Sequence, residues 1–305
     1  MTTYLVLGAS GFLGSHVHEA INRSEDEPCL VAVGRRPPRI ALPPRSSWVP
    51  LDLAGASVKD LVVLIQASRP DALINCAGRT SGTAEELWDI NTTFVEKLVQ
   101  AMRLSGPTPL VHLGSAAEYG VQPGNVSINE AALTHPVSDY GRSKLAATRK
   151  IVYATEQGDI SATVLRVFNP IGTGAPEDSL VGRAIKELRL ALRNNRRFIT
   201  MGPLGAYRDF VAARDVASAA LRVTQLTTTD PVINVGRGVA ISCRALVELL
   251  ANVAGYDGGI VEVGDGSARS EAVSWQQADI ARLVHNLDWL PRTPLAEALE
   301  ELWHS

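Results

Sequence analysis

The sequence is poor in cysteine, and the cysteines it has are neither clustered nor even in number. Three occur in 305 residues, Cys29, Cys76 and Cys243, at wide and unequal spacing. Such a pattern argues against a disulfide framework and against a cysteine-based metal site. We therefore expect buried free thiols and a reducing, cytoplasmic setting.

Long apolar runs and an excess of one charge are missing as well. No apolar stretch approaches the roughly 18 residues that a membrane-spanning helix needs, and the start of the chain lacks the features of a signal peptide. Lysine and arginine number 29 against 32 aspartates and glutamates. This balance gives no electrostatic reason to expect nucleic acid or a membrane surface as a partner. The six histidines show no ligand spacing, so no metal site is predicted.

What the sequence does contain is a regular alternation of short apolar runs and longer amphipathic stretches. The runs are TYLVLG, CLVAVG, DALINCAG, PLVHLGS and ATVLRVFNP, and the helices expected between them cover residues 12–22, 85–104 and 140–155. Strands that are covered on both faces read as continuous apolar runs, and helices connect them in parallel sheets. The pattern therefore predicts an α/β fold with a doubly wound parallel sheet.

The segment LVLGASGFLGS carries Gly8, Gly11 and Gly14 between the first predicted strand and the first predicted helix. A tight turn, the approach of a pyrophosphate to the backbone, and helix packing each need a residue without a side chain here. The free N–H groups at the start of the helix would hold the pyrophosphate. The predicted cofactor contacts in this segment are Gly8, Ser10, Gly11, Phe12, Leu13 and Gly14.

The end of the second predicted strand indicates which dinucleotide is bound. Arg35 and Arg36 follow Gly34, and no acidic residue stands beside them. A carboxylate would bind the ribose 2′-hydroxyl of NAD, whereas a guanidinium suits the 2′-phosphate of NADP. NADP(H) is therefore favoured, with NAD(H) as the open alternative. Farther on, Asp52 and its neighbour Leu53 are placed to meet the adenine.

The segment YGRSK places Tyr140 and Lys144 one helical turn apart, so that both side chains emerge on the same face. A free tyrosine has a pKa near 10 and transfers protons poorly at neutral pH. A nearby ammonium stabilises the phenolate and lowers that pKa. The pair can therefore move a proton.

The glycine segment, YGRSK and the segment GSAAEYG between them together resemble the extended short-chain dehydrogenase/reductase family, in its NAD-dependent nucleotide-sugar epimerase, dehydratase and reductase group. Further matching segments are NCAG, DINTTF, LRVFNPIGTG, YRDFVAARDVA, INVGRG and LDWLPRTPLAEAL. The resemblance covers nearly the whole chain. It implies a Rossmann sheet followed by a smaller α/β region, and an enzyme that acts on nucleotide sugars.

The resemblance also implies roles for individual residues. Ser115 would hydrogen-bond the substrate oxygen, Tyr140 would be the general acid and base, and Lys144 would bind the nicotinamide ribose while lowering the pKa of Tyr140. Further cofactor contacts implied by NCAG and DINTTF are Cys76, Ala77, Gly78 and Asn91. The implied substrate contacts are Ser115, Ala116, Asn169, Arg208 and Arg269.

Among the substrate residues, Arg269 matches least well. It lies in SARSEAV, where the family usually has Arg-Pro-Gly-Asp, so a surface arginine remains the alternative. Residues 1–169 are expected to form the dinucleotide-binding domain with a returning segment near 209–236, and residues 170–305 mainly the nucleotide-sugar region. A basic helix over residues 180–194 is expected to have a solvated face. The resemblance further implies a homodimer through the helices near Glu85 and Tyr140.

Three reactions in this family use the same serine, tyrosine and lysine. A 4,6-dehydratase also needs an acid and a base, usually an Asp-Glu pair directly after the serine or threonine. This chain has Ala116 and Ala117 there, and methyl groups cannot transfer protons. Glu118 is expected to point to the opposite face of a continuing strand. Dehydration is therefore ranked last.

Reduction and 4-epimerisation both remain open. An epimerase would keep NAD tightly bound, whereas a reductase exchanges a reduced cofactor, typically NADPH. The arginines after the second strand and the two alanines favour reduction of a keto group on a nucleotide-linked deoxysugar. A catalytically silent dinucleotide-binding regulator is a further alternative, because a fold does not fix function. Retention of Ser115, Tyr140 and Lys144 together argues against it.

Overall fold

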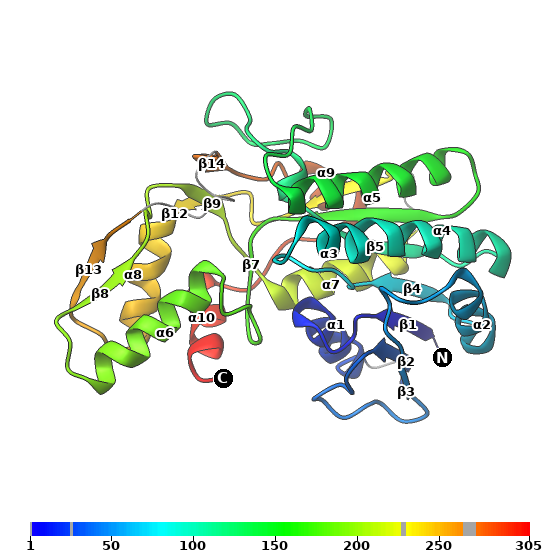
Figure 1. The fold of residues 1–305 in the computed structure, drawn as a ribbon, viewed down its shortest axis with the longest axis horizontal. Helices are drawn as coiled ribbons and strands as arrows, with labels where there is room; N and C mark the ends of the chain where they lie inside the picture. Colours follow the sequence, from blue (N-terminus) through cyan, green and yellow to red (C-terminus); the bar gives the residue numbers. More distant parts are fainter. Residues whose placement is uncertain (1, 25–26, 227–229, 265–272) are drawn as a thin grey trace.

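The computed structural model describes residues 2–24, 27–226, 230–264 and 273–305. At its centre lies a seven-stranded sheet with the order β11-β6-β5-β4-β1-β2-β3, in which every neighbouring pair is parallel (Figure 1). Its strands are β1 (Thr3–Leu7), β2 (Cys29–Gly34), β3 (Ser47–Pro50), β4 (Ala72–Asn75), β5 (Leu110–Ser115), β6 (Ala162–Val167) and β11 (Val232–Val235). The predicted doubly wound parallel sheet is confirmed.

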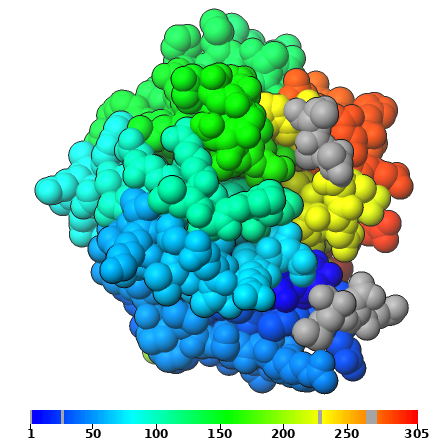
Figure 2. Space-filling view, turned by 90° about the vertical axis from the view of Figure 1, so that its right-hand side faces the viewer, coloured from blue at the N-terminus to red at the C-terminus, as the bar shows by residue number. Residues whose placement is uncertain are grey.

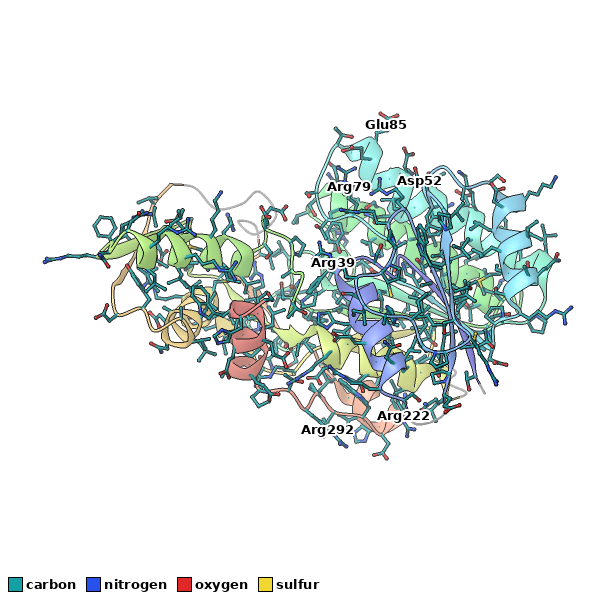
Figure 3. The ribbon with its side chains drawn as sticks, turned by 90° about the horizontal axis from the view of Figure 1, so that it is seen from below. Arg39, Asp52, Arg79, Glu85, Arg222 and Arg292 are labelled. Carbon is teal, nitrogen blue, oxygen red and sulfur yellow. The ribbon has the colours of Figure 1, made fainter. Side chains whose placement is uncertain are left out.

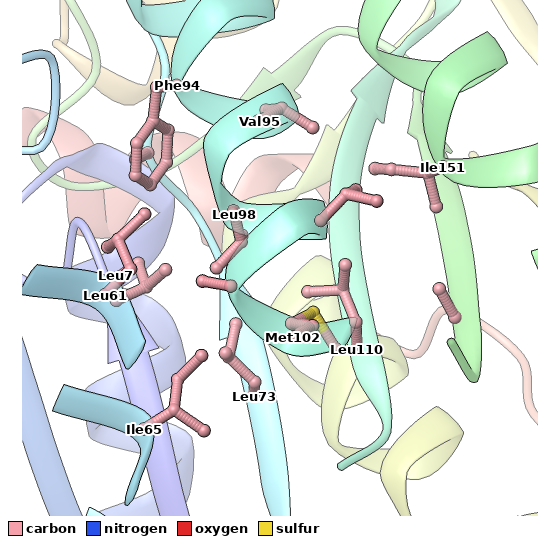
Figure 4. Close-up of a cluster of buried hydrophobic side chains, with 14 of the residues drawn as sticks. Leu7, Leu61, Ile65, Leu73, Phe94, Val95, Leu98, Met102, Leu110 and Ile151 are labelled. Carbon is pink, nitrogen blue, oxygen red and sulfur yellow. The ribbon is translucent and has the colours of Figure 1, made fainter. Parts of the chain in front are cut away.

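Three helices cover one face of this sheet: α2 (Val58–Ser68), α4 (Phe94–Ser105) and α5 (Asp139–Glu156). Their apolar side chains share one core with the strands, and Figure 4 shows Leu98 of α4 and Leu61 of α2 within it. Both leucines are completely buried. Burial of a leucine side chain contributes about 2 kcal/mol to stability, so this layer holds the strands and the loops at their ends in fixed positions.

The opposite face is covered by α1 (Phe12–Asn22), α7 (Ala213–Thr224) and α9 (Ala281–Leu287). Val17 of α1 and Val216 of α7 are completely buried in the second core. The sheet is therefore the middle layer of three. Figure 2 shows the molecule from the right-hand side of Figure 1, where the surface comes mostly from the first half of the chain. In the part of the chain that the structure describes, no helix is long and apolar enough to cross a membrane.

The expected helix over residues 85–104 consists of three pieces. They are α3 (Ala84–Trp88), a π-helical turn η1 (Asp89–Thr93) and α4. Asn91 lies in the turn and is fully buried, and its amide bonds the backbone of Arg79 and the Ser143 hydroxyl. A wide turn inside a helix often accompanies a functional site. Here the π-helical turn is stabilised by the hydrogen bonds of the Asn91 side chain to distant segments.

Most of the second half of the chain packs beside the sheet around a core of its own. This core comes from α6 (Leu180–Arg193), α8 (Cys243–Val253) and α10 (Leu295–Trp303), which cluster with the paired strands β8 and β13. The short strands are β7 (Pro170–Ile171), β8 (Phe198–Met201), β9 (Tyr207–Asp209), β10 (Val211–Ala212), β12 (Ala240–Ser242), β13 (Gly259–Glu262) and β14 (Trp275–Gln276). The predicted basic helix is confirmed as α6.

The three cysteines are free thiols in the structure, as expected. Each of them is half-buried, whereas full burial was expected. Cys29 opens β2, Cys76 follows β4 and Cys243 opens α8.

The strand order places the ends of several strands at one edge. β1 pairs with β2 on one side and with β4 on the other, so the chain order reverses between β1 and β4. In such sheets ligands bind outside the carboxyl ends of the strands at this point. Gly8, Gly34, Cys76 and Ser115 lie at these carboxyl ends.

Candidate active site

The glycine turn after β1 fits a dinucleotide pyrophosphate. Gly8 has φ +77°, and a Cβ on it would lie 2.8 Å from the Ala77 nitrogen. A Cβ on Gly14 would lie 2.1 Å from the Gly8 carbonyl oxygen. α1 begins after Gly11 without a side-chain cap and without an acidic residue in its first turn. Its N-terminal N–H groups and dipole therefore face an open turn that suits an anion.

A cavity of about 520 Å³ opens beside this turn. The predicted cofactor residues that line it are Gly8, Ser10, Gly11, Arg35, Arg36, Asp52, Leu53, Cys76, Ala77 and Gly78. They come from the loops after β1, β2, β3 and β4. Figure 3 shows Asp52 and Arg79, from two different loops, side by side at this end of the sheet. The cavity thus gathers residues that are far apart in the sequence.

The other predicted cofactor residues lie elsewhere. Phe12 lines a second cavity, Leu13 packs on a hydrophobic core, and Gly14 packs against the Gly8 carbonyl. Asn91 accepts the Arg79 N–H at 2.9 Å and donates to the Arg79 carbonyl at 2.9 Å. It therefore fastens the loop that forms the cavity wall.

Two residues of the cavity wall that follow NCAG in the chain were not predicted from the sequence. Arg79 and Glu86 both line the cavity and form an ion pair of 2.8 Å. Glu86 also belongs to a capping box with Thr83 at the start of α3. The Thr-x-x-Glu spacing was the one local signal for this arrangement. Nothing near Arg79 in the sequence shows that it lies on a cavity wall.

Ser115 ends β5 and begins a tight turn. Residues Ala116–Glu118 form a single 3₁₀ turn, in which the Ser115 Oγ accepts a hydrogen bond from the Ala117 N–H at 3.2 Å. The expectation that the strand continues to Glu118 is therefore wrong. Glu118 turns back, and its carboxylate accepts the Ser115 N–H at 2.8 Å. The Ser115 hydroxyl hydrogen remains available for another acceptor.

Tyr140 lies in the first turn of α5. The Ser138 side chain caps this helix by accepting the Gly141 N–H at 3.1 Å. A Cβ on Gly141 would lie 2.5 Å from the Ala117 carbonyl oxygen. The start of α5 therefore packs directly on the turn that follows Ser115, and the half-buried Tyr140 is next to this contact.

Lys144 is the most deeply buried member of the predicted catalytic set, at 4% exposure. Its Nζ donates to the Leu113 carbonyl at 2.5 Å and lies 3.4 Å from Nε2 of His112. Burial lowers the pKa of Lys144 from its usual value to about 8, although Glu118 and Cys76 favour the charged form. His112, which the sequence analysis passed over as part of a strand, is thus part of the site.

The second cavity, of about 300 Å³, contains two predicted substrate residues, Asn169 and Arg208. The Asn169 amide donates to the Asp209 carbonyl at 2.9 Å and to Oε1 of Gln276 at 3.4 Å. Gln276 in turn donates to the Ala116 carbonyl at 3.0 Å. Gln276 thus links the Ser115 turn to the second cavity, and no local feature of the sequence predicts this link.

Arginines of different origin meet at this second cavity. Arg208 is 7% exposed and donates to the Tyr207 carbonyl at 2.7 Å and the Val273 carbonyl at 2.6 Å. Burial lowers its pKa from the usual range. Arg183 of α6 also lines the cavity, so the exposed face of this helix contributes to the cavity wall. Arg269, the remaining predicted substrate residue, lies outside the described residues.

Residues 4–236 match the model of the NAD dependent epimerase/dehydratase family. The chain is 36% identical over 301 residues to the dTDP-6-deoxy-L-talose 4-dehydrogenase (NAD(P)(+)) of Kitasatospora kifunensis, covering 98% of this chain and 93% of the relative. It is 28% identical over 314 residues to the GDP-6-deoxy-D-mannose reductase of Pseudomonas aeruginosa, covering 98% and 96%. The solved structure of RMD from Pseudomonas aeruginosa complexed with NADPH is similar with a TM-score of 0.84 at 25% identity, covering 100% and 98%.

These matches extend over both cavities and both halves of the chain, and the relatives named above are nucleotide-sugar dehydrogenases and reductases. The chain belongs to the NAD dependent epimerase/dehydratase family and is an NAD(P)-dependent enzyme of the extended short-chain dehydrogenase/reductase type.

Proposed function

We propose that the protein reduces the keto group of a nucleoside-diphosphate 4-keto-6-deoxyhexose, with NADPH as the preferred cofactor. The observation that carries the proposal is the packing of the Tyr140 end of α5 on the turn after Ser115. It is supported by the 36% identical relative, whose name gives a 6-deoxyhexose nucleotide, position 4 and NAD(P)(+). The GDP-6-deoxy-D-mannose reductase points to the same class of sugar.

In this proposal Tyr140 donates the proton and Ser115 orients the substrate. When bound, a reduced nicotinamide cofactor would supply the hydride that reduction of the carbonyl carbon needs. Tyr140 gives its hydroxyl proton to the carbonyl oxygen, and the Ser115 hydroxyl donates a hydrogen bond to that oxygen, because its own lone pair already accepts the Ala117 N–H. Lys144, one turn from Tyr140, stabilises the phenolate that remains.

The surroundings of Ser115 support reduction over dehydration. Ala116 and Ala117 offer no proton donor or acceptor in their side chains. Glu118 is completely buried, and its two oxygens bind the Ser115 N–H and the Arg166 side chain. No second acid or base is therefore supplied by this turn, and one proton donor is what a ketone reduction needs.

The first cavity is proposed to hold the dinucleotide and the second cavity the nucleoside diphosphate of the sugar. Arg35 and Arg36 would meet the adenosine 2′-phosphate of NADPH. Arg208 and Arg183 would meet the diphosphate of the substrate, since guanidinium groups bind such oxygens well. This division follows the expected domains, with residues 1–169 and a segment near 209–236 for the cofactor and 170–305 mainly for the substrate.

The decisive experiment is to purify the protein, identify any retained cofactor, and follow the oxidation of NADPH and NADH with thymidine- and guanosine-diphosphate 4-keto-6-deoxyhexoses. We expect stoichiometric NADPH oxidation and a 6-deoxyhexose nucleotide as product. Tightly retained NAD with interconversion of 4-epimers and no net NADPH consumption would replace the reductase by a 4-epimerase. Tyr140→Phe is expected to lower kcat about 100-fold or more while cofactor binding is kept; undiminished activity would contradict the role of Tyr140.

We also infer a homodimer through the helices that begin near Glu85 and Tyr140. Trp88 of α3 is 46% exposed and Tyr153 of α5 is 61% exposed, and these two helices are in contact. Aromatic side chains are enriched at protein interfaces. Light scattering should give twice the mass of the chain, and Tyr153→Glu should shift it toward the monomer. A monomeric wild type would exclude this interface.

A further inference from the structure

A row of buried polar side chains lies where α5 packs on β4 and β5, and none of its members is among the residues that line the two cavities. It consists of Asn75 at the end of β4, His112 in β5 and Lys144 in α5. Asn75 and His112 are completely buried and lie opposite each other in the paired strands. The Asn75 Nδ2 lies 3.0 Å from the His112 Nδ1, and the His112 Nε2 lies 3.4 Å from the Lys144 Nζ.

The direction of these hydrogen bonds is fixed by the backbone. The Ala77 N–H donates to the Asn75 Oδ1 at 3.0 Å. The amide of Asn75 therefore turns its Nδ2 toward His112, because a flipped amide would face the Ala77 donor with another donor. His112 Nδ1 must then accept. A ring that accepts at Nδ1 is neutral and carries its one proton on Nε2. Burial, the main cause that lowers the pKa of His112 well below its usual value, favours the same neutral form.

Lys144 therefore faces a donor. The His112 Nε2–H is directed at a nitrogen that can accept only as a neutral amine, since an ammonium has no lone pair. The amine can still donate one of its hydrogens to the Leu113 carbonyl. We propose that His112, oriented by Asn75, is a positioning residue that favours the neutral amine of Lys144 over its ammonium in the cofactor-free enzyme, and that cofactor binding moves Lys144 away from His112 as an ammonium, with uptake of one proton from the solvent where the amine was neutral.

Burial is the main cause that lowers the pKa of Lys144, and the charged and titratable groups around it must be considered beside His112. Glu118, from the turn after β5, favours the ammonium, but its carboxylate is already paired with Arg166 at 2.8 Å. Cys76, after β4, is a neutral thiol, because burial raises its pKa to about 12. Asn91 of η1 and the Gly78 backbone are uncharged neighbours.

The consequence is a coupling between cofactor binding and the acidity of Tyr140, and it rests on the proposed function. Without cofactor, and at a pH above the Lys144 pKa of about 8, Lys144 is mainly a neutral amine and stabilises a phenolate poorly. The ribose hydroxyls proposed as the partners of Lys144 offer acceptor oxygens, which favour the ammonium. The pKa of Tyr140 is then lowered only when the cofactor that completes the reaction is bound.

The test is a titration of Lys144 by nuclear magnetic resonance. The chain has only five lysines, Lys59, Lys97, Lys144, Lys150 and Lys186, so labelling lysine with ¹³C at Cε gives few signals, and Lys144→Arg assigns one of them. In the free enzyme we expect Lys144 to titrate about two pH units below the usual value of about 10.4. Saturation with NADPH should move this titration upward by about one pH unit or more.

Asn75→Asp reverses the direction of the hydrogen bonds that run from residue 75 through His112 to Lys144. The carboxylate can still accept the Ala77 N–H, and its second oxygen accepts a proton on His112 Nδ1. Nε2 then becomes an acceptor for the ammonium, and the Lys144 titration of the free enzyme should rise by about one pH unit or more. The effect of the added negative charge alone is measured in the His112→Phe background. There, Asn75→Asp should raise the Lys144 titration clearly less than it does in the protein that keeps His112.

Three results would overturn the inference: a Lys144 signal that titrates with the other lysines, a titration that NADPH leaves in place, or equal rises in the two Asn75→Asp backgrounds. The first two need only the wild-type protein, so a variant that does not fold leaves the inference falsifiable. Calorimetry of NADPH binding in two buffers of different ionisation enthalpy should show proton uptake near pH 8.5. If Lys144 titrates at an unusually low pH for a lysine but the protein binds no nicotinamide cofactor, the proposed function is wrong, whereas the inferred role of His112 in favouring the neutral amine of Lys144 is supported.

Discussion

The Glu118 carboxylate and the Arg166 guanidinium form a buried ion pair directly beneath the Ser115 turn. The Glu118 Oε2 lies 2.8 Å from the Arg166 Nε, and the two side chains are 0% and 6% exposed. The guanidinium also stacks 4.5 Å from the ring centre of Tyr119. One carboxylate thus holds the Ser115 backbone and neutralises a buried cation, so the serine turn and the ion pair depend on each other.

Glu118→Gln should destabilise the protein by about 3–5 kcal/mol, because it leaves Arg166 as an uncompensated buried charge. Urea denaturation measures this loss. The control is Asp159→Asn, which breaks an exposed ion pair with Arg103 of 2.5 Å and should cost about 1 kcal/mol or less. Equal losses of unfolding free energy in the two variants would show that the buried Glu118–Arg166 pair stabilises the protein no more than an exposed ion pair does.

Gly141→Ala should disturb the placement of Tyr140. The new Cβ would lie 2.5 Å from the Ala117 carbonyl oxygen, so the start of α5 must move away from the Ser115 turn. Overpacking of this kind costs about 1–3 kcal/mol, and kcat should fall about tenfold or more because the proton donor is misplaced. Gly205→Ala is the matched control, since a Cβ there meets nothing within 4 Å. A fully active Gly141→Ala enzyme would refute the tight packing.

An element could be predicted from the sequence where the interactions that form it lie within its own segment. The helix expected over residues 12–22 has those bounds in the structure, because its glycine turn and apolar period lie within the segment. The helix expected over residues 85–104 is interrupted, since Asn91 bonds to residues before it and far after it. β3 and α2 were not predicted, although Ser57 and Asp60 form a capping box at the start of α2.

The candidate site shows the same limit. Tyr140 and Lys144 share one helical turn, so their proximity could be predicted. The orientation of Glu118 could not, because its partner Arg166 lies 48 residues later in a neighbouring strand. His112 looked like one more residue of a buried strand, and only the pairing of β4 with β5 places it between an amide and an amine.

The two arginines after β2 should determine cofactor preference. Arg35→Ala/Arg36→Ala is expected to lower kcat/KM for NADPH about 10- to 100-fold, because charged hydrogen bonds to a phosphate contribute about 1.5–3 kcal/mol. The value for NADH should change little, since NADH has no 2′-phosphate. Arg39→Ala is the control: Arg39 belongs to the same loop but lines a different cavity. Equal losses with NADPH and NADH would assign the arginines another role.

His16 should make the protein less stable in mild acid. It lies buried in α1, and its Nε2 bonds the Thr173 carbonyl at 3.0 Å in the loop after β7. Burial is the main cause that lowers its pKa below 6.5. The unfolded chain therefore binds more protons than the folded protein once the pH falls to about 6.5, and stability falls as the pH is lowered further.

His16→Gln can keep a donor for the Thr173 carbonyl while removing the titration. Wild type should lose more stability than this variant between pH 7 and pH 5, and the two curves should run parallel above pH 7. Urea denaturation at each pH gives both curves, and the difference between them cancels the groups that both proteins share. Curves that stay parallel down to pH 5 would mean that His16 is charged in the folded protein as readily as in the unfolded chain.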